Sequence, residues 1–163
     1  MTEDLHRRFG VEFNNATWSD LAADQPGPDA TDAERERFLY RAYASAYHWM
    51  ETPTTTPANR ARGEHLVARA AIAVGLPDVA VRHARRCREL CELHSDVVED
   101  WDLAFAEEAL ARALAAAGDL VAAREHLELA GRLGGEIGDD DDREVFLDEL
   151  AREPWFGLDP SGS

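Results

Sequence analysis

Apolar side chains recur three and four residues apart along almost the whole chain, which is the spacing of an amphipathic helix. We find no convincing run of alternating apolar and polar residues of the kind that predicts a strand. Glycines, prolines and capping residues interrupt the helical pattern and divide it into seven segments. The predicted helices cover about 3–23, 32–51, 57–74, 77–94, 101–117, 120–134 and 140–151. The pattern therefore predicts an all-α protein of about seven helices.

Local chemistry sets the ends of several predicted helices. Thr56 is followed by Pro57, and proline suits the first turn of a helix because its missing N–H would have no partner there. Gly75 and Gly118 each follow an apolar segment, so we expect them to end helices in the left-handed conformation.

The two predicted helices nearest the amino end are rich in aromatic residues. Because a helix buries one stripe of apolar side chains, we expect these residues to face the core. The predicted buried residues are Leu5, Phe9 and Phe13 on the first helix, with Trp18 and Leu21 further along, and Leu39, Tyr43, Ala46, Tyr47 and Met50 on the second.

Length and charge narrow the class of protein. A chain of 163 residues suits one compact domain. Its net charge of −16 argues against a general nucleic-acid or anionic-membrane surface, because both need a positive field. The charge is uneven, with 7 Arg against 4 acids in residues 60–94 and 5 Arg against 19 acids in residues 95–163. Within this charge distribution, the locally basic middle is the feature that most suggests a functional surface.

Other features predict a cytoplasmic protein. No uncharged apolar run approaches the roughly 20 residues needed to span a bilayer, and the amino end lacks the pattern of a signal peptide. Cys87 and Cys91 lie four residues apart in a helical pattern, where a disulfide would strain the helix. We therefore expect reduced thiols and a cytoplasmic location.

Two segments of the chain are alike. Residues 66–75 and 110–118 are both alanine-rich and both end in glycine, and the two glycines lie 43 residues apart. A small residue follows each glycine by five positions, and apolar residues follow by nine and twelve. These residues are Ala80, Ala84 and Cys87 in the first copy and Ala123, Leu127 and Ala130 in the second.

This pattern resembles the tetratricopeptide repeat (TPR), in which helical hairpins with a glycine turn stack side by side. The resemblance covers about 60–93 and 103–133 and departs from the family at the first aromatic position, where Glu64 and Glu107 stand. The spacing of 43 also exceeds the usual value of about 34. The resemblance implies a right-handed stack of antiparallel hairpins, with a single domain over 1–153 and a tail over 154–163.

The same resemblance places the first helix of each hairpin on a concave face. It predicts that Arg62, His65, Arg69, Phe105 and Arg112 line a groove there. Since the planar fork of arginine pairs well with carboxylate, we predict a non-enzymatic module that binds an acidic or C-terminal peptide without a cofactor. The alternative is that these arginines pair with Glu64 and with acids of the next hairpin, and hold the stack together.

Three further hypotheses come from other segments. The aromatic residues of Tyr40–Trp49 could line a small-molecule pocket, although such residues more often belong to the core. The His83–His94 face, with its two cysteines, could supply two metal ligands, although core packing explains the cysteines better. The apolar tail at Trp155 and Phe156 could join two copies as a homodimer.

Overall fold

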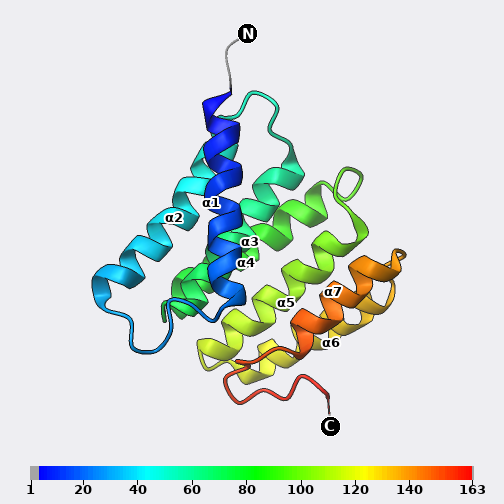
Figure 1. Cartoon of the computed structure of the whole chain (residues 1–163). Coiled ribbons are helices and arrows are strands. Elements are labelled where there is room, and N and C mark those ends of the chain that lie inside the picture. Colours follow the sequence, from blue (N-terminus) through cyan, green and yellow to red (C-terminus); the bar gives the residue numbers. More distant parts are fainter. Residues whose placement is uncertain (1–3, 163) are drawn as a thin grey trace.

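The computed structural model describes residues 4–162, and every regular element in that range is a helix (Figure 1). The elements are α1 (Leu5–Ala22), α2 (Asp32–Glu51), α3 (Pro57–Ala73), α4 (Pro77–Leu93), α5 (Asp100–Ala116), α6 (Leu120–Gly135) and α7 (Asp140–Ala151). The prediction of an all-α protein of about seven helices is confirmed, and each helix end lies within two residues of its predicted position. No helix of the described range has the length and apolar character that crossing a membrane requires.

The helices form a stack of hairpins in chain order. Helix α1 packs against α2, α3 against α4 and α5 against α6, while α2 contacts α3 and α4 contacts α5. The first helices of the hairpins also meet, because α3 contacts both α1 and α5. Helix α7 packs against α5 and α6 at the end of the stack (Figure 1). The chain is thus an all-helical repeat in which neighbouring hairpins lie side by side.

Gly75 and Gly118 turn the second and third hairpins in the same way. Their φ angles are +78° and +88°, in the left-handed region that glycine adopts without a steric penalty. After Gly75 the N–H of Leu76 donates to the carbonyl of Ala71 at 2.9 Å. After Gly118 the N–H of Asp119 donates to Leu114 at 3.0 Å. Both predicted helix ends are confirmed as Schellman turns.

Small residues build the largest core cluster. Alanines from α3, α4, α5 and α6 are fully buried in it, which lets the helix backbones approach closely. They include Ala68, Ala71, Ala80, Ala84, Ala109, Ala113 and Ala123. Trp155 and Leu158 join the same cluster from the tail. The segment beyond residue 153 is therefore packed against the stack.

The predicted buried stripes of the first two helices are wrong in part. Leu5, Tyr47 and Met50 are more than half exposed, at 52%, 55% and 53%. The residues of α1 and α2 that are buried are Gly10, Thr17, Phe38, Ala42 and Ser45. At this contact the hydroxyl of Ser45 donates to the carbonyl of Gly10 at 2.8 Å. Small residues such as Gly10 and Ser45 allow this close approach, which leaves Tyr47 and Met50 exposed, whereas Leu39, Tyr43 and Ala46 pack against the core.

Candidate functional site

A cleft with a volume of about 360 Å³ opens on the face formed by α1, α3, α5 and α7. These are the first helices of the three hairpins and the terminal helix, so the cleft lies where the repeat pattern places a concave face. Its lining includes Trp18 from α1, Arg62 and His65 from α3, Trp101 and Phe105 from α5, and Glu149 from α7. Aromatic rings from two helices and polar groups from two others thus share one cavity.

The structure brings three of the five predicted groove residues together in this cleft: Arg62, His65 and Phe105. The other two, Arg69 and Arg112, line a neighbouring hollow of about 360 Å³ between the tail and the α1–α2 loop. Their side chains are only 10% and 1% exposed. These two arginines are therefore part of the packed interior rather than of an open groove.

Arg62 lies at the edge of the cleft with its charge already paired. Its Nε and Nη2 atoms donate to the two carboxylate oxygens of Asp102 at 2.9 and 2.8 Å. The hydrogen bond to Asp102 is the main cause that raises the pKa of Arg62. The guanidinium also lies over Trp101, 4.5 Å from the centroid of its ring. The charge of Arg62 is thus balanced by Asp102, and its planar guanidinium group stacks on the Trp101 ring.

His65 is held between two aromatic rings. Its ring stacks on Trp18 at 5.4 Å and meets Phe105 edge-on at 5.9 Å, both measured between centroids. Its Nε2 atom is buried and has no hydrogen-bond partner among the described residues. Burial, followed by repulsion from Arg69, lowers the pKa of His65 from 6.5 to about 4. At neutral pH the cleft therefore contains an uncharged imidazole with one unsatisfied nitrogen.

Below the cleft, four charged side chains form a network. Glu108 is buried between Arg69, at 3.1 Å, and Arg112, at 2.6 Å. Arg69 also pairs with Glu149 at 2.5 Å. Burial alone would raise the pKa of Glu108, but the attraction of Arg69 and Arg112 outweighs it and lowers the pKa. Glu108 is thus held as the charged partner of both arginines.

The three predicted arginines all pair with acids of α5, and for Arg62 and Arg69 that helix belongs to the next hairpin. Arg62 binds Asp102, while Arg69 and Arg112 both bind Glu108, and both acids lie on α5. Glu64, the other acid considered from the sequence, instead contacts His83 and lies 3.9 Å from Arg86. For Arg62 and Arg69, these pairs join α3 to α5, as the alternative interpretation of the sequence proposed.

Sequence reasoning missed a link that recurs in two hairpins. His83 Nδ1 lies 2.5 Å from a Glu64 oxygen, and His126 Nδ1 lies 2.5 Å from a Glu107 oxygen. Each pair spans 19 residues, and the two pairs are 43 residues apart, which is the distance between the turn glycines. That shared spacing is the signal that could have revealed them. Because the link recurs at equivalent positions, it fastens the two helices of each hairpin.

Sequence reasoning also missed the two tryptophans of the cleft. Trp18 belongs to α1, which carries no recognisable copy of the repeat, and Trp101 stands in the acidic link that begins α5. Neither position is marked by the repeat pattern. Only the contact between separate helices places both rings beside His65 and Arg62.

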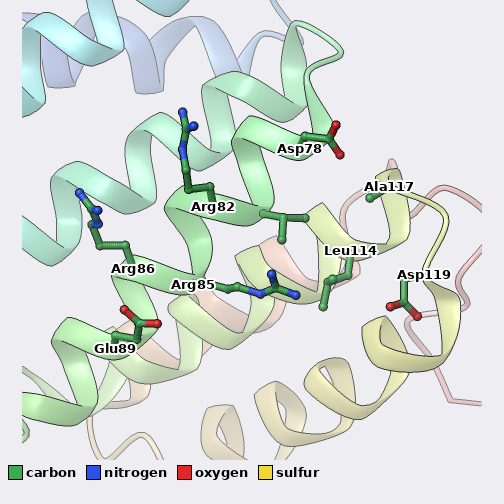
Figure 2. A pocket seen from close by; sticks show the side chains of 9 residues that line it. Asp78, Arg82, Arg85, Arg86, Glu89, Leu114, Ala117 and Asp119 are labelled. Atoms are coloured by element: carbon green, nitrogen blue, oxygen red, sulfur yellow. The ribbon is translucent and has the colours of Figure 1, made fainter.

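A second hollow, of about 550 Å³, lies between α4 and the α5–α6 turn. Figure 2 shows that Arg82 and Arg86 point to one side of α4 while Arg85 extends toward Leu114. The hollow is also lined by three acids: Asp78, Glu89 and Asp119. Since its arginines diverge and an equal number of carboxylates surrounds them, it does not concentrate positive charge. The aromatic cleft is the stronger candidate.

The residues of Tyr40–Trp49 are spread over several environments. Tyr40 is 66% exposed, and the Tyr43 hydroxyl lies 3.0 Å from His83 Nε2. Trp49 lies against Gly10, where an added Cβ would be 3.1 Å from the indole ring. Tyr40, Tyr43 and Trp49 therefore do not share one pocket, whereas Tyr47 and His48 meet each other and His6 at the edge of the α1–α2 contact.

The His83–His94 face is occupied by internal contacts. His83 is bound by Glu64 and Tyr43, and Cys87 and Cys91 are both free and buried. The hydrogen bond with Cys91, followed by burial, raises the pKa of the Cys87 thiol. Across residues 4–162 no group of three or more His, Cys, Asp or Glu side chains is arranged to hold a metal ion.

The tail packs onto its own chain. Trp155 is fully buried beneath Arg112, whereas Phe156 is 42% exposed. Of the two aromatic residues considered for self-association, Phe156 is thus the one that remains at the surface. A homodimer through this segment stays a prediction.

No protein-family model, curated protein or solved structure matches this chain. The protein is therefore classed by its own fold and site. It is an all-helical repeat in which the first helices of the hairpins line an aromatic cleft.

Proposed function

We propose that this protein is a non-enzymatic, TPR-like interaction module that takes an extended segment of a partner protein in the cleft between α1, α3, α5 and α7. Two features support a TPR-like arrangement: the equivalent turns at Gly75 and Gly118 and the equivalent links at Glu64 and Glu107. In such a stack, the surface shared by the first helices is continuous and suits an extended chain. Function does not follow from the fold alone, so the argument rests on the cleft.

One observation carries the proposal: three aromatic rings line a single cavity together with His65, whose buried Nε2 atom has no hydrogen-bond partner among residues 4–162. Trp18, Trp101 and Phe105 come from two different hairpins, and His65 lies among them. A buried polar atom without a partner is costly, and a cavity lined by apolar surface with a few polar groups is typical of a binding site. A bound ligand would satisfy the nitrogen and cover the rings.

The charge preference of the peptide stays a prediction. Arg62, Arg69 and Arg112 are each paired with carboxylates, so they add no surplus positive charge to the cleft. Arg62 is the best placed of the three to recognise an acidic group, because 39% of its side chain is exposed. Most of the favourable free energy would come from the aromatic walls.

The test uses a residue at the cleft that can be changed without disturbing the core. Val145 lines the cleft from α7 and is 61% exposed, so Val145→Arg would obstruct the cleft and leave the packing intact. The matched control is Val121→Arg on α6, where the valine is 77% exposed and lines a different surface hollow. Peptides are selected against the wild-type protein from a random library displayed on phage.

We expect the selected peptides to lose at least tenfold in affinity on Val145→Arg and to keep their affinity on Val121→Arg. Circular dichroism checks that both variants fold. The proposal is wrong if selection yields no binding peptide, or if the selected peptides bind Val145→Arg as tightly as the wild-type protein.

A further inference from the structure

We infer that the cleft selects an aromatic side chain with a polar edge, a tryptophan or a tyrosine of the partner, whose N–H or O–H group hydrogen-bonds to His65. This inference rests on the proposed function and names the residue that the cleft recognises. It is carried by the arrangement of rings around His65 and by the charge balance of the cavity.

The walls of the cleft favour a flat ring. Trp18 stacks on His65 with an angle of 26° between the ring planes, and Phe105 meets His65 at 70°. Trp101 stands edge-on to Phe105, with 6.2 Å between centroids, and has Arg62 on one face. Aromatic pairs gain favourable free energy from the geometry of their rings beyond the area that they bury, which an aliphatic side chain cannot recover.

The volume fits one such residue and its neighbours in the chain. A cavity of about 360 Å³ lies at the lower end of the range for small-ligand sites, about 300–1,000 Å³. It suits a single ring system rather than a large cofactor.

The polar groups of the cleft favour an uncharged hydrogen-bonding partner. Asp102 is bound by Arg62 and Glu149 by Arg69, so the carboxylates and the arginines near the cavity balance one another. His65 Nε2 is the buried side-chain atom of the cleft that still lacks a partner among residues 4–162. A ring with an N–H or O–H at its edge would supply that partner, whereas phenylalanine would leave the nitrogen unsatisfied.

The test compares three blocked amino acids that differ only in the side chain. ¹⁵N-labelled protein is titrated with N-acetyl-tryptophanamide, N-acetyl-tyrosinamide and N-acetyl-phenylalaninamide, and amide shifts give each Kd. We expect shifts on α3 and α5, and an affinity about threefold to tenfold weaker for the phenylalanine compound, which lacks the hydrogen bond. His65→Phe should remove this difference, and His65→Gln, which keeps polar atoms, should restore part of it.

The outcomes separate the inference from the proposed function. If all three compounds bind the wild-type protein equally, or if His65→Phe keeps the preference, the inference is overturned while the peptide cleft stands. The inference is also overturned if none of the three shifts the cleft amides although phage-selected peptides do. Selective binding of the tryptophan and tyrosine compounds that Val145→Arg abolishes supports the inference, even where no longer peptide is selected and the proposed function fails.

Discussion

The guanidinium of Arg112 lies 4.0 Å from the centroid of the Trp155 ring and fastens the C-terminal segment to α5. The same side chain donates hydrogen bonds to the carbonyls of Arg152 and Pro154, both at 2.8 Å, and to that of Glu149 at 3.0 Å. These carbonyls lie at and just beyond the end of α7, where the backbone no longer makes the regular hydrogen bonds of a helix. Arg112 therefore binds a segment of backbone, and that segment belongs to its own chain.

Removing the indole ring should destabilise the fold strongly. Trp155 is fully buried, so we expect Trp155→Ala to lower the free energy of unfolding by about 3–5 kcal/mol. Urea denaturation followed by circular dichroism measures this change. The control is Phe156→Ala, at a residue that is 42% exposed, which should cost less than about 1 kcal/mol. Equal effects of the two substitutions would contradict the assigned role of Trp155.

The buried charge network should depend on Glu108. Glu108→Gln leaves Arg69 and Arg112 close together without the carboxylate that they share, so we expect a loss of about 3–5 kcal/mol. Because the pKa of Glu108 is lowered, its contribution is present above the pKa of the unfolded state and is lost as the pH falls toward the folded pKa. Glu128→Gln, at an exposed position on α6, is the control and should change little. A loss below about 1 kcal/mol in urea unfolding would show that the network is not stabilising.

His65 should make the fold sensitive to mild acid. Its pKa is about 4 in the folded protein and 6.5 ordinarily, so the unfolded chain binds the additional proton between these values. Stability should therefore fall as the pH drops from 7 to 5, by about 2 kcal/mol from this residue. Urea midpoints at both pH values measure the effect, and His65→Phe should remove it. An unchanged difference in His65→Phe would assign the acid sensitivity to other groups.

The recurring links should be energetically alike. Double-mutant cycles with alanine at Glu64 and His83, and at Glu107 and His126, measure the coupling within each pair. We expect about 0.5–3 kcal/mol for each, since both pairs have the same 2.5 Å contact. Arg88 also pairs with Glu107, so the single substitution Glu107→Ala should cost more than its own cycle reports. Coupling near zero in either pair would remove it as a link between helices.

Two glycines of α6 should respond oppositely to alanine. A Cβ at Gly134 would lie 2.1 Å from the Phe146 ring, so Gly134→Ala must push α7 away and should cost more than about 1 kcal/mol. A Cβ at Gly131 would meet nothing within 4 Å, and Gly131→Ala should stabilise the helix by about 0.5–1 kcal/mol. Thermal unfolding of both variants measures the difference. Similar Tm shifts would contradict the contact between Gly134 and α7.

Much of the fold could be predicted because its signals are local. Helix caps such as Thr56, turn glycines such as Gly75 and apolar spacing act over a few residues, and each helix end lies within two residues of its predicted place. The repeat also predicted which helices share a face, so Arg62, His65 and Phe105 were placed in one cleft. On α2 only Tyr47 and Met50 were wrongly predicted to be buried, because apolar spacing does not say which face a small-residue contact will choose.

The sequence by itself determined the helices, their turns and the order in which hairpins stack, because those depend on hydrogen bonds and side chains close along the chain. Only the tertiary structure decided how the charges and rings are used. Arg112 meets Trp155 across 43 residues, and Trp18 meets His65 across 47. The packing of helices that are distant in the sequence decides which side chains meet. The residues next to an arginine in the sequence do not show whether it is free to bind a ligand or already paired with a buried acid.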